Sequence, residues 1–84
     1  MRNMKTIVYS KNNCMQCKMV KNWLTDRGID FKEINIEDQP EYRDKLIDLG
    51  LKSAPITQVE FNDKEGIYIL GFAIGELRET FGVR

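Results

Sequence analysis

The feature that most constrains this chain is a pair of cysteines, Cys14 and Cys17, that directly follows a β-rich run. They are the only cysteines in the sequence, and Met15 and Gln16 separate them. A pair with this spacing can bind a metal ion, form a structural disulfide or exchange electrons with another thiol or disulfide. A structural disulfide closing so small a loop would restrict the unfolded chain little, which argues against the second use.

The composition is that of one small folded domain covering residues 1–84, since a core of this size rarely divides. Thirteen basic residues balance 13 acidic ones, so no field of one sign draws the chain to nucleic acid or to an anionic membrane. The sequence has neither the apolar run of an export signal nor a stretch of ~18 apolar residues that could span a membrane. We therefore expect a cytoplasmic protein. In that compartment a cysteine pair is more often catalytic or metal-binding than structural.

Hydrophobic periodicity predicts seven elements in the order β-α-β-α-β-β-α. The first two strands are joined by a helical crossover and should be parallel, whereas the last two form a hairpin through the turn-rich residues 62–66. The fold class is therefore α/β, with a four-stranded mixed sheet flanked by three helices. The four strands are expected at residues 5–10, 31–37, 56–61 and 67–70.

Each of the three predicted helices has one apolar face. The first follows Asn12 or Asn13, either of which can cap it, and ends at Gly28. The second opens at Asp38, has Pro40 in its first turn and ends at Gly50, and the third ends near Gly82. The expected inward residues are Cys17, Val20 and Leu24, with Met19 and Trp23 beside them, on the first helix; Tyr42, Leu46 and Leu49, with Ile47, on the second; and Ile74, Leu77 and Phe81 on the third.

The number of ligands argues against a metal site within this chain. A structural zinc site takes four Cys or His ligands, and the chain has two Cys and no His. Acidic side chains or a second chain would have to complete the set. A zinc or iron–sulfur module that uses Cys14 and Cys17 across a dimer is therefore kept as an alternative of another class, while we expect no resident metal or cofactor.

Redox chemistry fits the position of the pair, because C-x-x-C beside a βαβ pattern is typical of thioredoxin-like proteins. Cys14 is expected at or just before the first helical turn, where unpaired N–H groups and the helix dipole stabilise a thiolate. Cys17 lies one turn deeper and should be more buried and less ionised. We therefore expect Cys14 to attack a disulfide in a partner and Cys17 to resolve the resulting mixed disulfide.

The run "VYSKNNCMQCKMVKNWL", together with Ala54-Pro55 ahead of the third strand, resembles the thioredoxin fold and, more narrowly, its glutaredoxin branch. Within that branch it is closely similar to the NrdH-redoxins, over nearly the whole chain. The resemblance implies a thiol–disulfide oxidoreductase that donates electrons to class Ib ribonucleotide reductase. It also implies re-reduction by thioredoxin reductase with electrons from NADPH, and we expect a monomer with these two proteins as partners.

The resemblance also implies roles for individual residues. Cys14 would be the nucleophile and Cys17 the resolving thiol. Pro55 would follow a cis peptide bond and face the pair, and the Ala54 backbone would pair with an extended partner segment. The other expected partner contacts are Lys11, Met15, Gln16, Gly71 and Phe72.

One stretch departs from the family pattern. NrdH-redoxins usually carry Trp-Ser-Gly-Phe-Arg-Pro ahead of the last helix, and here the run "ILGFAIGEL" keeps only Gly71 and Phe72 of it. This stretch contributes to the rim near the cysteines and bears on the choice of partner. It does not match the Gly-Gly-x-x-Asp type motif by which glutaredoxins hold glutathione, although Lys11 matches a lysine that contacts glutathione in many of them. A glutathione-dependent glutaredoxin is the second expectation.

Overall fold

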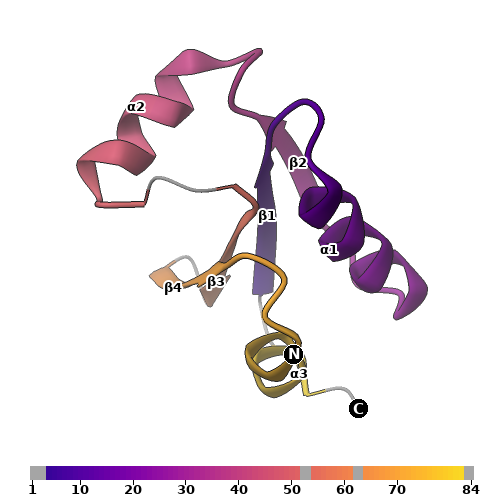
Figure 1. Ribbon diagram of the computed structural model, residues 1–84. Coiled ribbons are helices and arrows are strands. Elements are labelled where there is room, and N and C mark those ends of the chain that lie inside the picture. The colour runs from indigo at the N-terminus through magenta and orange to yellow at the C-terminus, as the bar shows by residue number, and fades with distance from the viewer. Residues whose placement is uncertain (1–3, 52–53, 62–63, 83–84) are drawn as a thin grey trace.

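Four strands form one mixed sheet with the order β2-β1-β3-β4. A computed structural model describes residues 4–51, 54–61 and 64–82. β1 runs parallel to β2 and antiparallel to β3, and β3 runs antiparallel to β4 (Figure 1), so the predicted order and mixed sheet are confirmed. The elements are β1 (Met4–Ser10), α1 (Met15–Asp26), β2 (Lys32–Asn35), α2 (Pro40–Asp48), β3 (Ile56–Phe61), β4 (Lys64–Leu70) and α3 (Ile74–Phe81).

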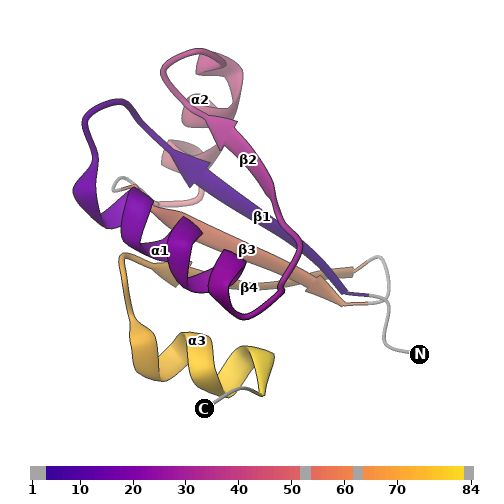
Figure 2. The same ribbon diagram turned by 90° about the vertical axis from the view of Figure 1, so that its right-hand side faces the viewer.

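The helices cover both faces of the sheet, with α1 and α3 on one face and α2 on the other (Figures 1 and 2). Successive residues of a strand point to opposite faces, so β1 sends Val8 to the α1–α3 side and Tyr9 to the α2 side. Burial of apolar side chains on both faces stabilises this arrangement. The α1–α3 core consists of Val8, Val20, Trp23, Leu24, Ile69 and Leu77, and the α2 core of Ile7, Tyr9, Ile34, Leu46 and Ile56.

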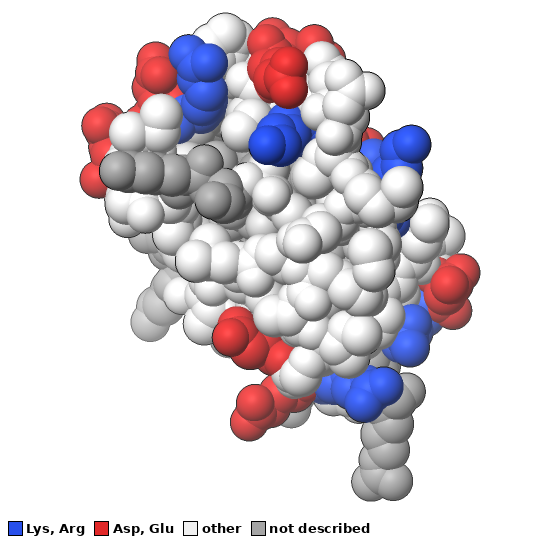
Figure 3. Space-filling view, viewed as in Figure 1, with Lys and Arg blue, Asp and Glu red and all other residues white. Residues whose placement is uncertain are grey.

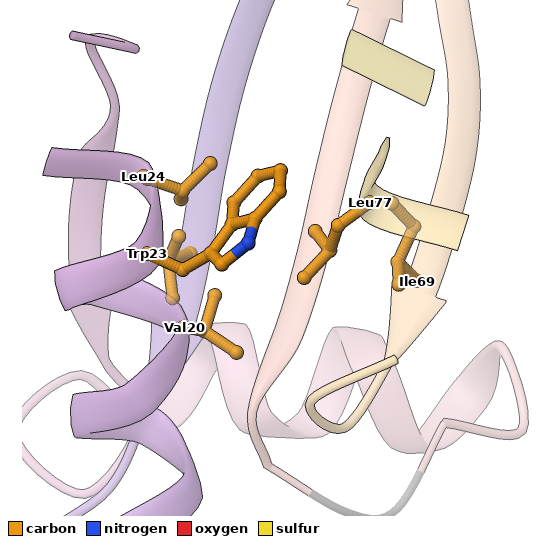
Figure 4. Packing of buried hydrophobic residues seen from close by; sticks show 6 residues of the cluster. Val20, Trp23, Leu24, Ile69 and Leu77 are labelled. Atoms are coloured by element: carbon orange, nitrogen blue, oxygen red, sulfur yellow. The ribbon is translucent and has the colours of Figure 1, made fainter. Parts of the chain in front are cut away.

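The α1–α3 core packs the first helix against the last strand and the last helix. Figure 4 shows Val20, Trp23 and Leu24 of α1 facing Leu77 of α3 and Ile69 of β4. Trp23 is buried, as predicted. β4 ends where α1 begins, so the short connection from β4 to α3 lies at that end of the sheet (Figure 2).

The start of α1 differs from the prediction, because the helix is capped by Cys14 and not by Asn12 or Asn13. Cys14 has extended backbone angles, and its Sγ accepts a hydrogen bond from the backbone N–H of Cys17 at 3.1 Å. Asn13 has a φ of 56°, the left-handed conformation that asparagine tolerates better than most residues. Asn13 is therefore part of the turn that leads into the helix. The predicted end is confirmed, since Gly28 takes the left-handed conformation directly after the cap residue Arg27.

The predicted apolar stripe of α2 is too wide. Leu46 is buried and Tyr42 half-buried, but Ile47 and Leu49 are 46% and 49% exposed. Leu49 is the C-cap of the helix, so it no longer follows the helical repeat that carried the prediction. α2 begins at Pro40, with Gln39 and not Asp38 at the N-cap position.

Three smaller predictions also need correction. Met19 is 41% exposed and lies outside the apolar face of α1. β2 is shorter than expected, and β4 begins at Lys64, so the strand includes part of the predicted turn. Residues 62 and 63 of that turn lie outside the described residues. None of the described helices is long and apolar enough to cross a membrane.

Candidate active site

The two cysteines lie at the N-terminal end of α1, where they form a disulfide with Cα atoms 5.3 Å apart. Cys14 is the N-cap, and its carbonyl oxygen accepts the first intrahelical hydrogen bond from Lys18 N–H. Its sulfur accepts from Cys17 N–H, one of the backbone donors that have no partner within the helix. A donor directed at this sulfur stabilises negative charge on it, so the geometry favours a thiolate at Cys14 when the disulfide is reduced.

The two sulfur-bearing residues differ in exposure. Both are buried, but Cys14 is 9% exposed and Cys17 only 1%, so Cys14 is the more accessible of the two. Met15 and Gln16, between them, are exposed, and Met15 is 70% so. Met15 therefore places an apolar side chain on the surface next to Cys14 in the chain.

A cis peptide bond joins Ala54 to Pro55, as the resemblance implied. Pro55 is buried, and its carbonyl oxygen accepts a hydrogen bond of 2.8 Å from Gly71 N–H. That bond lies one pair beyond the last β3–β4 partners, Ile56 and Leu70. Pro55 and Gly71 are therefore neighbours at the end of the sheet that faces the start of α1.

Gly71 lies against the first turn of α1. Its φ is 69°, and a Cβ at this position would come within 3.4 Å of Gln16 Oε1. The structure thus brings together five of the expected site residues, the cysteine pair with Gln16 on one side and Pro55 with Gly71 on the other. Phe72 is half-buried and packs against the α1–α3 core, which leaves only part of its ring for a partner.

A set of polar contacts that the sequence did not reveal holds the loop before Cys14. Glu37 accepts hydrogen bonds from Asn12 N–H at 3.0 Å and from Asn12 Nδ2 at 3.2 Å. Asn35 Nδ2 donates to Asn12 Oδ1 at 3.0 Å, and Asn35 Oδ1 accepts from Glu37 N–H at 2.9 Å. Asn35 ends β2, and Asn12 and Glu37 follow β1 and β2, parallel strands whose carboxyl ends meet at one edge of the sheet. Side-chain pairing over this sequence distance has no local signal.

Lys11 lies in the same loop, but it borders a groove on the α2 side of the sheet. The groove has a volume of about 520 Å³ and begins next to the site, because Ile56 in its lining follows Pro55 directly. Its lining is mainly aliphatic, with charge at the edges. The lining residues are Lys11, Ile36, Glu37, Arg43, Leu46, Ile47, Leu51 and Ile56.

A carboxylate links three elements on the α1 side of the sheet. Glu33 Oε2 accepts hydrogen bonds from Lys21 Nζ at 2.8 Å and from the buried Ser10 Oγ at 2.7 Å. The hydrogen bond from Lys21, followed by that from Ser10, lowers the pKa of Glu33 below its ordinary value. The ionised carboxylate thus ties α1 to the end of β1.

The face of the molecule at which α1 begins is mostly uncharged. Figure 3 views the molecule from the end where α1 begins, and uncharged side chains cover its middle, with acidic and basic groups towards the rim. Within the described part of the chain, no three His, Cys, Asp or Glu residues come close enough to hold a metal ion. The arrangement suits contact with another protein near the disulfide.

The chain is similar to known redox proteins in sequence. The family model described as glutaredoxin matches residues 6–64. A glutaredoxin-like protein NrdH of Lactococcus lactis subsp. cremoris is 50% identical over 70 residues, which cover 83% of this chain and 90% of that protein. An N-acetyl-S-hydroxy-L-cysteine reductase of Bacillus subtilis is 31% identical over 67 residues, which cover 77% of this chain and 72% of that protein.

A solved structure shows the same relationship. The glutaredoxin-like protein NrdH-redoxin of Escherichia coli, which has a thioredoxin-like activity profile, superposes with a TM-score of 0.76. The alignment covers 89% of this chain and 92% of that one at 28% sequence identity. The four-stranded sheet with helices on both faces is therefore the thioredoxin fold.

Proposed function

The chain belongs to the glutaredoxin family as an NrdH-like thiol–disulfide oxidoreductase, and from this premise we propose that it donates electrons to class Ib ribonucleotide reductase and is re-reduced by thioredoxin reductase. The observation that carries the proposal is the Cys14–Cys17 pair at the start of α1. The name of the L. lactis relative and the thioredoxin-like activity of the E. coli protein support it.

In the proposed reaction Cys14 is the nucleophile. Its thiolate attacks one sulfur of the partner's disulfide, a bond forms between the two sulfurs, and the partner's second sulfur leaves with the electron pair and takes up a proton. The greater accessibility of Cys14 compared with Cys17, and the hydrogen bond from Cys17 N–H to its sulfur, support this role. The product is a mixed disulfide between Cys14 and the partner.

Cys17 completes the reaction. It loses its proton and attacks Cys14 Sγ, the bond between Cys14 and the partner breaks, and the partner's sulfur leaves as a thiolate that is then protonated. Two electrons have then passed to the partner, and Cys14 and Cys17 are joined. The near-complete burial of Cys17 supports the assignment, because such a thiol reacts with Cys14 before any external disulfide can reach it.

The contacts with the partner are proposed from the neighbourhood of the disulfide. The backbone at Ala54 would pair with an extended partner segment beside Pro55, as an added strand does. Met15, Gln16, Gly71 and Phe72 would form the rim, and Lys11 would contact a segment that continues into the groove. The reaction needs no cofactor besides the cysteine pair, and we place it in the reducing cytoplasm, with the protein as a monomer.

The first experiment measures NADPH consumption with a protein disulfide as acceptor and two alternative sources of electrons. One source is thioredoxin reductase, and the other is glutathione with glutathione reductase. Turnover with thioredoxin reductase alone is expected. Turnover with glutathione alone would make the protein a glutathione-dependent glutaredoxin, and Lys11→Glu should then raise the KM for glutathione.

Serine variants test the two roles. Cys14→Ser should abolish disulfide reduction, whereas Cys17→Ser should still attack and should accumulate a mixed disulfide that is visible by mass spectrometry. If Cys14→Ser retained the wild-type rate, the assignment of the nucleophile would be wrong. Metal analysis of the purified protein tests the alternative of another class, and half an ion or more per chain would support a dimeric metal site.

A further inference from the structure

Thr57 carries a buried hydroxyl that the described residues leave without a partner. The residue is fully buried, and its Oγ1 has no hydrogen bond within the described part of the chain. A buried hydroxyl without a partner costs free energy, because it has given up its hydrogen bonds to water. The strand register places Thr57 near the redox pair, where a sulfur atom could accept a hydrogen bond from this hydroxyl.

Thr57 lies on the side of the sheet that carries α1 and α3. In the strand register it is flanked by Val8 on β1 and by Ile69 on β4, and both of these belong to the α1–α3 core. Directly opposed residues of antiparallel strands point to the same face. The Thr57 side chain therefore points into the layer between the sheet and α1.

Within that layer Thr57 is close to the end that carries the cysteines. The row of Ile56 and Leu70 comes next, and beyond it Pro55 pairs with Gly71, which lies against Gln16 in the first turn of α1. Cys17 is in the same turn and shares the inward face of α1 with Val20. Cys17 is thus the inward residue of α1 nearest to this end of the sheet, and Thr57 lies two residue pairs from the Pro55–Gly71 pair on the same face.

A second hydroxyl on this face, among the described residues, is already used. Ser10 lies two residues after Val8 and so points to the same face, but its Oγ donates to Glu33 at 2.7 Å. Unlike Ser10, Thr57 therefore has a hydroxyl that donates no hydrogen bond to any of the described residues. In the disulfide, Cys17 Sγ is a weak acceptor, and it becomes a strong one when it carries negative charge.

We propose that Thr57 is a positioning residue for the second half of the reaction, in which its Oγ1 donates a hydrogen bond to Cys17 Sγ once the disulfide is open. A donor to the charged form lowers the pKa of a thiol, so the hydroxyl raises the fraction of Cys17 thiolate that attacks Cys14. The bonds made and broken are those given above for the Cys17 step. This inference rests on the proposed roles of the two cysteines.

The test is the reaction of the reduced protein with Ellman's reagent, followed by stopped flow. Attack by Cys14 releases the first coloured thiolate and attack by Cys17 releases the second, so the two phases report the two steps separately. Thr57→Val keeps the shape and removes the hydroxyl. It should slow the second phase by about tenfold and move its pH profile to higher pH, since a hydrogen bond to a charged group has about this effect. The first phase should not change.

Two further variants separate this role from a structural one. Thr57→Ser restores a hydroxyl and should return the second phase to within about twofold of the wild-type rate. Thr6→Val makes the same change on β1 in the row of Val59, further from the cysteines, and should leave both phases unchanged. Oxidised Thr57→Val should resist urea at least as well as wild type, because it loses a hydroxyl that has no partner in that state.

An unchanged second phase in a folded Thr57→Val protein would overturn the proposal. Should that variant not fold, NMR of the wild-type protein decides, since the Thr57 hydroxyl proton should exchange more slowly in the reduced than in the oxidised state. Equal exposure to exchange in both states would refute the hydrogen bond. A wild-type protein without a second phase, or a Cys14→Ser protein that reacts normally, would instead refute the assigned roles of the cysteines.

Discussion

Cys14 has a structural contact as well as its proposed chemical one. The sulfur that accepts Cys17 N–H caps α1, and the same contact would stabilise the attacking thiolate. Serine at this position keeps an acceptor for the cap, so Cys14→Ser tests the chemistry with little change to the helix.

The capping contact predicts different stabilities for two variants of Cys14 under reducing conditions. Cys14→Ala removes the acceptor, and it should unfold with a free energy about 1 kcal/mol lower than that of Cys14→Ser. Urea titration with excess reductant measures the difference. Equal midpoints would mean that the side chain at position 14 does not stabilise the helix.

Leu46 in α2 and Leu49 at its C-cap predict a second contrast at the residue scale. Leu46 is buried in the α2 core, and Leu46→Ala should lower the free energy of unfolding by roughly 2–4 kcal/mol. Leu49 is half-exposed, and Leu49→Ala should change it by less than ~0.5 kcal/mol. Similar losses for both variants in urea would show that Leu49 packs in the core after all.

The end of α1 depends on backbone conformation and not on packing. Gly28 has a φ of 68°, and a Cβ there would meet no atom within 4 Å. The conformation has two consequences, because it ends the helix and lets Ile29 N–H bond to Leu24 O at 2.9 Å. A side chain at this position would be strained even though there is space for it.

Alanine substitutions at two glycines test this interpretation. Gly28→Ala should lower the free energy of unfolding by about 1 kcal/mol, since alanine is strained in the left-handed conformation. Gly75 is inside α3 and also has open space around it, and Gly75→Ala should raise the free energy by about 0.5–1 kcal/mol through helix propensity. The opposite signs should appear in thermal or urea unfolding. A stabilising Gly28→Ala would show that the turn can relax.

At the scale of the whole molecule, Glu33 connects the sheet to α1. The hydrogen bonds from Lys21 and Ser10 lower its pKa in the folded state below the ordinary value of 4.5. A carboxyl group with a lowered pKa stabilises the folded state when it is ionised. Its contribution is complete well above pH 4.5 and is lost as the pH falls through the folded-state pKa.

The pH dependence of Glu33→Gln follows from this sign. The variant should be less stable than wild type at neutral pH, by less than about 1 kcal/mol because the carboxylate is 40% exposed and screened by solvent. The difference should shrink as the pH falls below about 4.5. Urea unfolding at a series of pH values gives the curve, and a difference that grows in acid would contradict the interpretation.

Much of the fold could be read from local patterns. The β-rich run Lys5–Ser10 and the helical spacing of Cys17, Val20 and Leu24 predicted β1 and α1, and the structure confirms both. The pattern was wrong where a helix ends, since Leu49 fits a helical repeat that stops at Asp48. Periodicity cannot locate such an end, because the residue that leaves the helix is as apolar as those within it.

The sequence by itself determined the chemistry of the site, since two cysteines three positions apart at the start of a helix need only local geometry to form a redox pair. It also determined the mixed topology, because a helical crossover makes strands parallel and a tight turn makes them antiparallel. Only the tertiary structure decided what surrounds the pair. Strands and loops far apart in the chain place Gly71 beside Gln16 and bring Glu37 within hydrogen-bond distance of Asn12. They also leave the Thr57 hydroxyl without a partner among the described residues. Such neighbours are set by the register and packing of the whole sheet.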